Sequence, residues 1–416
     1  MLDPERQGKF ANSYTVNFPD YPSFNTQPKK LTLIQHINNH DVMILKFQYF
    51  NSLIASSFKT GTPVEISWNN DKSTKKFIGY VSHIQYPTTQ ILDRYIEIVC
   101  VGGSYPLKEE ASKIWVNTSA SQVAIEIAKT LHLKPLVTSS NVKFSQISMA
   151  GHTYWEKLVE LANRIGYGVQ VLGAELHFHP IDKMIDQFMT TIPVLAFLDP
   201  YTNSNAAFSV QTLDFFESKL GDFVEKHSNN RTNKIVSGVD PVTGKVYKSN
   251  SSPHLMGSKL RQTVKAPLFN KVEAGVVANS ESIVKALSEG KAHLSRLSIP
   301  GKGASQGDPR ISPWGTIELR NTGTHSDGFW IVTSTKHEMH IDGRYMVEFS
   351  CATDGVGSNQ PSVTRPGTAG TVPAVNLGSG TTGTNANHSY TLSGATTIID
   401  QTNTGFNVTP RRWVGI

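Results

Sequence analysis

Two stretches of this chain, one near its beginning and one near its end, follow the same plan of three strand-like segments. In each stretch, alternating apolar and polar residues recur at matching spacing, and a cysteine, Cys100 or Cys351, stands at the same place near the end. Alternation with a period of two is typical of half-buried β-strands. The matching segments are 61–67, 77–86 and 93–103 in the first stretch and 315–320, 328–339 and 342–355 in the second. We therefore expect two similar antiparallel β-barrels, and two unrelated sheets that merely alternate alike are the alternative.

The residues between the two stretches change to a helical period. Ser119 and Thr153 each open a capping-box pattern, and apolar residues at helical spacing follow both. Gly166 stands where a helix stop is preferred, and a hairpin over 167–179 follows it. These features predict a small α+β module inserted between the barrels.

The expected organisation is a β-rich α+β chain with two similar antiparallel β-barrel domains that flank this module. We expect a first barrel hub domain over 1–115, the module over 116–182, a connecting segment with a hairpin over 183–275, a helix plus the second barrel over 276–355, and a Gly/Ser/Thr/Asn-rich C-terminal arm or linker over 356–416.

Local patterns give further expectations for the second half. Residues 210–223 are interpreted as a strand followed by a short helical piece, and 240–244 as the tip of a hairpin. A helix is expected from Asn279 or Ser280 up to the Pro-Gly pair at 300–301. In the last 64 residues, Gly, Ser, Thr, Asn and Pro supply 38 positions, so this segment lacks the apolar surface to order by itself. We expect a linker, or an arm that orders against another chain and docks through its apolar tip at 413–416.

Composition excludes several classes of protein. The 416 residues allow two to four domains. The net charge of +6 is spread along the chain, which argues against a specific nucleic-acid partner. We find no apolar stretch near the ~20 residues of a spanning helix and no signal-peptide pattern at the N-terminus, so we expect synthesis in a cytoplasm and no direct membrane insertion.

The order of these modules resembles a known family. The segments "TYWEKLVELANRIGYGVQVLGAELHFH", "VSGVDPVTGKVY" and "GFWIVTSTKHEMHIDGRYMVEFSCATDG" follow one another between the two barrels and into the second. In this order they look like the bacteriophage baseplate hub proteins of the late control D type, which are related to the hub half of type VI secretion spike proteins. The resemblance covers roughly residues 30–355 and departs from the family in the C-terminal arm and the connecting segment.

The resemblance implies a structural, non-enzymatic role in a virion tail baseplate. It implies a homotrimer whose two barrels per chain form a pseudo-sixfold ring, with tail tube or distal tail proteins on one side and a central spike protein on the other. A tape measure protein is a further partner that the resemblance allows. A duplicated fold suits this role, because three chains would then present six equivalent barrels.

Candidate metal and nucleotide sites are all weak. His177 and His179 lie two apart on a predicted strand and share one face, but they lack a third placed ligand. His337 and His340 lie on a strand and face opposite ways, so they do not form the zinc-protease motif. The glycine-rich segment 301–307 follows a helix, which excludes a dinucleotide fingerprint and favours a mobile connection. We predict no metal and no cofactor.

Candidate catalytic groups are also poorly placed. Glycan hydrolysis needs two carboxylates across a cleft, and the available residues lie on predicted helix surfaces or turns: Glu109, Glu110, Glu156, Glu160 and Glu175. No serine or cysteine stands on a recognisable nucleophile elbow. We therefore expect no catalytic residues and no enzyme activity.

The other conspicuous residues are expected to pack in the core or to lie in solvent. Both cysteines are expected to be small buried hydrophobes. Core packing is the favoured role of the strand aromatics, although they could stack sugars or bases: Trp68, Tyr80, Tyr86, Trp314, Phe329, Trp330 and Tyr345. The doublets Lys29-Lys30 and Lys75-Lys76 are interpreted as solvated surface residues.

Two other functions stay open from the sequence. A tail-tip protein that cleaves peptidoglycan or binds glycans is the first. The second is the equivalent hub of a type VI or extracellular contractile injection system.

Overall fold

The structure is a computed structural model, and it describes most of the chain before residue 354. The described residues are 13–22, 24, 26–48, 58–70, 73–85, 95–188, 192–196, 220–225, 232–240, 242–251, 269–278, 280–294, 297, 299–320, 328–353, 387–392 and 395–400. Tyr86, residues 210–219 and the apolar tip at 413–416, to which the sequence expectations assign roles, lie outside them. No helix among the described residues has the length and apolarity needed to cross a membrane.

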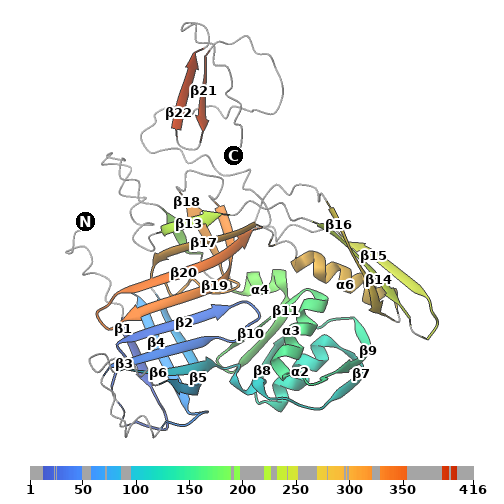
Figure 1. Cartoon of the computed structure of the whole chain (residues 1–416), viewed down its shortest axis with the longest axis horizontal. Helices are drawn as coiled ribbons and strands as arrows, with labels where there is room; N and C mark the ends of the chain where they lie inside the picture. The colour runs from blue at the N-terminus through green and yellow to red at the C-terminus, as the bar shows by residue number, and fades with distance from the viewer. Residues whose placement is uncertain are drawn as a thin grey trace.

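A curled 12-stranded sheet forms the larger part of the molecule (Figure 1). The first repeat supplies half of its strands, in the order β1 (Ser13–Asn17), β4 (Pro63–Asn70), β5 (Ser73–Gln85), β6 (Tyr95–Gly102), β3 (Val42–Gln48) and β2 (Lys30–His36). The second repeat supplies the rest, in the matching order β12 (Val194–Ala196), β18 (Thr316–Arg320), β19 (Gly328–His340), β20 (Tyr345–Thr353), β17 (Ile299–Gln306) and β13 (Leu220–Glu225). The expectation of two similar barrel-like halves is confirmed, and they differ in that β1 is antiparallel to β4 whereas β12 is parallel to β18.

The two repeats also match in their irregularities. Val81 lies opposite Cys100 in the first repeat, Val332 lies opposite Cys351 in the second, and the register of each strand shifts directly after that valine. Such β-bulges bend a strand and are features of a particular fold. A duplicated bulge beside a duplicated cysteine therefore excludes two unrelated sheets.

The turn that precedes β4 or β18 is duplicated as well. The Gly61 N–H donates to the carbonyl of Val81 (2.7 Å), and the Trp314 N–H donates to the carbonyl of Val332 (2.9 Å). Both residues have positive φ, 88° at Gly61 and 66° at Trp314. Gly61 therefore corresponds to Trp314, one residue before the Gly315 that the sequence spacing aligned with it.

One hydrophobic core serves both repeats. It contains Leu33, Leu45 and Trp68 from the first repeat and Trp330 and Val347 from the second, all at most 3% exposed. Both cysteines are buried, as expected. Because the two repeats share one buried core, they form a single packed unit and not two separately packed barrels.

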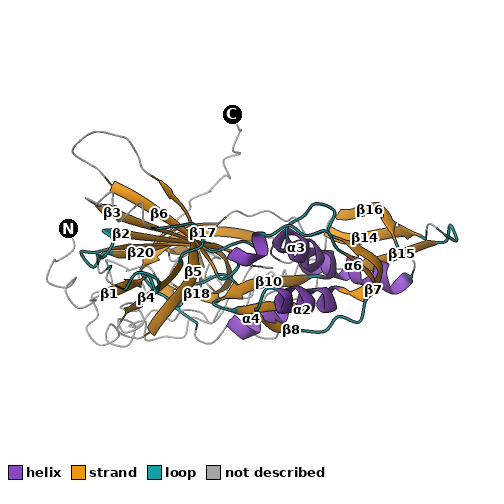
Figure 2. Ribbon diagram, turned by 90° about the horizontal axis from the view of Figure 1, so that it is seen from below, coloured by secondary structure: helices purple, strands orange, loops and turns teal. Residues whose placement is uncertain are grey.

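The α+β module packs beside the sheet, and most of the helices gather there (Figure 2). Its elements are the 3₁₀ turn η2 (Tyr105–Lys108), β7 (Ile114–Ser119), α2 (Ala120–Thr130), β8 (Lys134–Val137), β9 (Lys143–Ser148), α3 (Tyr154–Ile165), β10 (Tyr167–Leu172), β11 (Glu175–Pro180) and α4 (Ile181–Phe188). Both predicted capping boxes form, at Ser119 and at Thr153, and Gly166 ends α3 in the left-handed conformation. The short strands β7, β8 and β9 and the helix α4 were not expected from the sequence.

A second three-stranded sheet and helix α6 pack against this module. The strands β14 (Thr232–Val239) and β15 (Val246–Ser251) form the predicted hairpin, and β16 (Phe269–Val277) lies parallel to β14. Helix α6 (Glu281–Leu294) packs through Ile283, Val284 and Leu287 into the core of the module. In the C-terminal arm, β21 (Asn387–Leu392) and β22 (Ala395–Asp400) pair as a hairpin.

Three local expectations are wrong. Helix α6 ends at Leu294, and Pro300 and Gly301 lie in β17. The glycine-rich segment expected to be a mobile connection is therefore mostly an interior strand, paired on both sides through residues 301–305. Leu220–Phe223 is extended in β13, where a short helical piece was expected.

Candidate functional site

The seam between the two repeats is the feature that sets the geometry of the sheet. Strand β2 of the first repeat pairs antiparallel with the second half of β19, from Lys30 opposite His340 to His36 opposite Ser334 (Figure 1). The Lys30 ammonium lies 3.0 Å from the Glu338 carboxylate across this seam. Backbone pairing fixes register and direction together, so the second repeat is held at one orientation to the first.

A buried polar group lies behind the seam. His337 is fully buried, its Nδ1 lies 2.8 Å from the Tyr345 hydroxyl, and the Trp68 Nε1–H donates to that hydroxyl at 3.3 Å. The Tyr345 hydroxyl is therefore shared between the Trp68 indole and the His337 imidazole. Burial and the nearby Lys75 charge hold the pKa of His337 well below its usual range. This group connects a strand of the first repeat to two strands of the second.

Lys75 points into this interior, contrary to the expectation of a surface doublet. Its Nζ is buried and has no hydrogen-bond partner among the described residues, whereas Lys76 is exposed. Burial lowers the pKa of Lys75 to about 8, and the carboxylates of Asp41 and Asp308 oppose this shift. Asp308 is also fully buried and is bound by the Arg310 guanidinium at 2.6 Å. The sheet therefore encloses charges as well as apolar side chains.

The turn between β2 and β3 connects the first repeat to the module. Asn38 Oδ1 accepts the Val169 N–H at 2.9 Å, and Asp41 accepts the side-chain amides of Gln35 (2.7 Å) and Gln170 (3.3 Å). Burial raises the pKa of Asp41 to about 6, while these hydrogen bonds oppose the shift. The module is thus anchored by specific polar contacts at one end of the seam.

Aromatic rings add contacts between the module and each of the two repeats. The His40 ring stacks on Trp155 at 4.7 Å, and burial, with the Lys108 charge, lowers the pKa of His40 to about 4, so this ring is neutral. From the second repeat, Trp314 covers Gly168, where a Cβ would lie 2.7 Å from the indole. The module therefore contacts both repeats and stabilises their mutual position.

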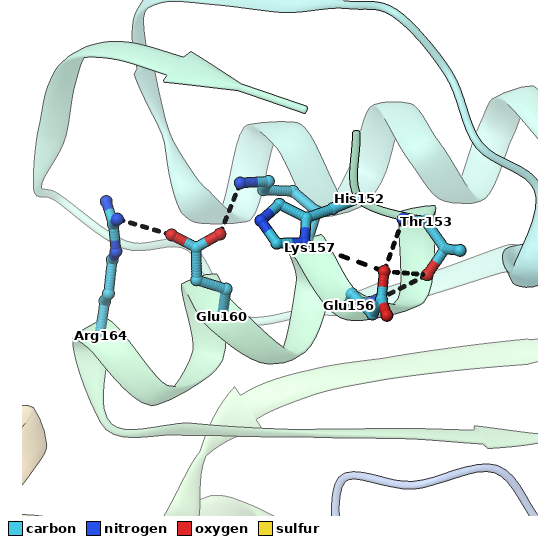
Figure 3. A network of polar contacts seen from close by, with 6 residues as sticks. All are labelled: His152, Thr153, Glu156, Lys157, Glu160 and Arg164. Carbon is cyan, nitrogen blue, oxygen red and sulfur yellow. Dashed lines mark hydrogen bonds and ion pairs between the residues drawn. The ribbon is translucent and has the colours of Figure 1, made fainter. Parts of the chain in front are cut away.

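Polar contacts along α3 are structural (Figure 3). The Glu156 carboxylate accepts the Thr153 N–H at 2.8 Å as part of the capping box, and Glu160 pairs with Lys157 and Arg164 at 2.5 Å each. Figure 3 shows these residues following one helix surface: His152, Thr153, Glu156, Lys157, Glu160 and Arg164. The pKa values of Glu156 and Glu160 are lowered, the opposite of what a general acid needs.

The other glutamates considered for glycan chemistry lie on the surface or in an ion pair. Glu109 and Glu110 are exposed, and Glu175 pairs with Lys134 at 2.7 Å. The hydrogen bond from Lys134 lowers the pKa of Glu175. The three glutamates on α3 and β11, Glu156, Glu160 and Glu175, therefore provide no proton donor of raised pKa.

His177 and His179 lie on one face of β11, as predicted, with ring centroids 5.8 Å apart. Gln187 Nε2 lies 3.1 Å from His177 Nδ1, and the Thr138 hydroxyl lies 2.8 Å from His179 Nδ1. Burial lowers both pKa values, that of His179 to about 4. Among the described residues, no group of three or more His, Cys, Asp or Glu is arranged to hold a metal ion.

The aromatic residues divide by position. Trp68, Trp314, Trp330 and Tyr345 are buried, which agrees with core packing. Tyr80 and Phe329 are partly exposed. Trp314 lies in the turn before β18 and not in a strand, so its position in the anchor was not predicted from alternation.

Comparisons with known proteins identify the fold. No family model matches the chain, and no curated protein matches it by sequence. Among solved structures, a tail protein from Neisseria meningitidis is similar with a TM-score of 0.56 at 12% identity, over 83% of this chain and 98% of the other. The 43 kDa tail protein of prophage MuSo2 from Shewanella oneidensis is similar with a TM-score of 0.54 at 13% identity, over 82% and 98%.

A secretion protein shares the same architecture. An Escherichia coli component of the type VI secretion system, itself structurally similar to phage T4 tail proteins, has a TM-score of 0.52 at 10% identity, over 82% of this chain and 76% of the other. The chain therefore has the fold of phage tail proteins and of this secretion component.

Proposed function

We propose that this chain is a structural hub of a phage-type tail baseplate, a homotrimer that joins a sixfold tube to a threefold spike. The duplicated sheet carries the proposal. Two matched repeats in one chain let three chains present six equivalent edges, and a symmetric ring is the usual way in which such copies assemble.

The seam and its anchor support a mechanical role. The repeats share a core, are joined by a backbone-paired seam, and are connected to the module by Asn38, Asp41 and Trp314. A part that transmits force between two symmetries needs rigidly fixed repeats. The fold shared with tail proteins agrees with this role.

The proposal includes the absence of catalysis. The glutamates with a resolved pKa shift on α3 and β11 are all shifted downward and engaged with basic or capping partners, which supports a non-enzymatic role. A purified chain that releases soluble peptidoglycan fragments, with the release abolished by Glu160→Gln or Glu175→Gln, would contradict it.

Assembly is the direct test. Sedimentation equilibrium at micromolar concentration should give the mass of three chains, and an electron microscope image should show a ring with six similar lobes on one side. A monomer that does not associate with tube protein would contradict the hub role. Tube, sheath and tape measure genes beside the coding gene would favour a virion tail over a secretion machine.

A further inference from the structure

The two repeats differ in what covers the face that β18 and β19, or β4 and β5, turn away from the shared core. In the second repeat, Phe329 and Ile331 of β19 lie on this outer face, and Ile331 is fully buried there. Counting back from the bulge of each repeat places Ile78 and Tyr80 of β5 at the equivalent positions. Ile78 is 44% exposed, and Tyr80 is partly exposed. The same face is therefore closed in the second repeat and open in the first.

The strand pairing supports this equivalence. Phe329 lies opposite Glu318 in the second repeat, and Ile78 lies opposite Glu65 in the first. A glutamate therefore stands at the same place on both faces. Because the face with Glu318 is closed, a glutamate at this place is compatible with a cover, and Glu65 does not prevent one.

A helix closes the outer face of the second repeat. Four apolar residues of α4 recur at positions i, i+3, i+4 and i+7, and they pack with Trp314, Phe329 and Ile331 in a cluster separate from the shared core: Ile181, Met184, Ile185 and Phe188. Such a stripe is the usual means by which an amphipathic helix lies on an apolar surface. The chain itself thus shows which kind of element fits this face.

Apolar and aromatic side chains gather on the open face of the first repeat. The Tyr80 and Tyr105 ring centroids lie 5.5 Å apart. The Ile78 Cδ1 atom lies beside the β10–β11 turn, 3.7 Å from the place of a Cβ on Gly173. Leu172, the preceding residue of that turn, is 38% exposed. These side chains form the first-repeat patch, defined as Ile78, Tyr80, Tyr105 and Leu172, and exposed apolar clusters of this kind mark interaction sites.

Basic side chains flank the first-repeat patch. Lys76 is exposed on the same side of β5 as the patch, and the exposed Lys108 has its ammonium 6.0 Å from the Tyr105 ring centroid. Acidic residues beside an apolar stripe would complement both lysines, and α4 carries two such residues, Asp182 and Asp186, beside its own stripe. Complementary charges of this kind favour one partner over others.

We propose that the first-repeat patch binds an amphipathic helix of a partner protein, with apolar residues at i, i+3, i+4 and i+7 and acidic residues beside them. This helix lies on β4 and β5 as α4 lies on β18 and β19. The inference needs only the duplicated fold and does not depend on a trimeric ring. A second copy of the chain is a poorer occupant, because the described helices α2, α3, α4 and α6 already pack their apolar residues within their own chain.

A stapled peptide copy of α4 is the probe. It has the sequence of Ile181–Phe188 with a fluorescein label, and a hydrocarbon staple joins positions 183 and 187, because a free helix of this length is marginal in water. Fluorescence anisotropy measures its binding to the full chain. We expect saturable binding that weakens at least about tenfold with Ile78→Asp, since a central apolar contact is lost. Ile114→Asp is the matched control, because Ile114 is an exposed isoleucine of β7, and it should leave binding unchanged.

Photocross-linking shows where the probe lies. A benzophenone side chain in place of Phe188 should cross-link to β4, β5 or the turn at 172–173, as read by mass spectrometry of digested protein. Cross-links to β18 or β19 would mean that the probe displaces α4 from the second repeat, and they overturn the proposal. The proposal is also overturned by a probe that does not bind, by equal weakening from both aspartate variants, or by undiminished binding of a probe with Met184→Asp.

Sedimentation separates a partner helix from a second copy. If Ile78→Asp lowers the mass of the assembled protein, copies of the chain cover the patch and the proposal is overturned. An unchanged mass together with specific probe binding supports it. A monomer that binds the probe through the patch contradicts the hub role and leaves this inference standing. The circular dichroism spectrum should match that of the unmodified protein, and if Ile78→Asp alters it, Leu172→Asp replaces that variant in each comparison.

Discussion

Replacing Lys75 by methionine tests whether the interior of the sheet carries an uncompensated charge. Methionine keeps most of the apolar stem and removes the buried ammonium. One pKa unit corresponds to about 1.4 kcal/mol. The fall from 10.5 to about 8 therefore makes the charged form about 3 kcal/mol less favourable in the folded protein than in the unfolded chain.

The carboxylates near Lys75 have other partners. Asp41 keeps its hydrogen bonds from Gln35 and Gln170, and Asp308 keeps its contact with Arg310. Loss of Lys75 therefore does not leave a bare buried anion, which is the usual reason that breaking a buried ion pair is costly. We expect Lys75→Met to raise the free energy of unfolding at neutral pH by about 1–3 kcal/mol.

The pH dependence gives a sharper signature. Below about pH 8 Lys75 is charged in both states, and the full burial cost weighs on the folded protein. Between about 8 and 10.5 the folded state releases the proton while the unfolded chain retains it, so the unfolded state binds more protons and the contribution of Lys75 to stability rises with pH. The variant lacks this rise, so its advantage over the wild type should disappear across the window.

Urea unfolding followed by tryptophan fluorescence, from neutral pH to about pH 10, measures both effects. Lys76→Met is the matched control, because this neighbour in the same strand is exposed and its change should stay within about 0.5 kcal/mol. If Lys75→Met destabilises the protein by the same amount at every pH, the reasoning on buried charge is refuted.

Three other changes probe the anchor and the module. Gly168→Ala should lower the free energy of unfolding by about 1–3 kcal/mol in urea, because the new Cβ would meet the Trp314 ring, and an unchanged midpoint would contradict that packing. Thr153→Ala should cost about 1 kcal/mol in thermal unfolding through loss of the cap, whereas Thr153→Ser should cost far less. Burial raises the pKa of Glu160, but the hydrogen bond from Lys157 and other basic charges lower it overall, so its stabilisation is present at neutral pH and lost in acid. Glu160→Gln should therefore cost up to about 1 kcal/mol at neutral pH, and its urea midpoint should converge with the wild type in acid; a constant difference would count against the ion pair.

The duplication was predictable because it depends on long alternating strands. Alternation over 77–86 and 328–339, and the cysteine near the end of each repeat, identified β5, β6, β19 and β20 without any structure. The capping boxes at Ser119 and Thr153 were equally predictable, since they depend on residues three apart.

Other elements lacked such local signals. The segment that becomes β17 is rich in small residues, and its strand character comes from pairing with β20 and β13, which are distant in sequence. The strands β7, β8 and β9 are short, and their pairing is also not local. Tertiary pairing decides such segments more than intrinsic preference does.

The prediction that Lys75 is exposed was wrong for a different reason. A charged doublet was interpreted as surface, yet alternation places Lys75 on the same side of β5 as Phe77 and Val81, both of which are buried. The alternation that identified β5 thus also indicated that the Lys75 side chain points toward the core. The position of Trp314 had no comparable signal, because it depends on the module that it covers.

The exchange of Gly61 for Trp314 shows how the two copies became unequal. Both positions hold the same left-handed backbone, which suits glycine, so the second copy accepts a less favourable residue there. The Trp314 indole contacts the inserted module at Gly168. The chain has one such module, so only one of the two repeats needs an aromatic side chain at this turn. The turn that contacts the module in the second repeat therefore differs from the same turn in the first repeat, where the space around Gly61 is open.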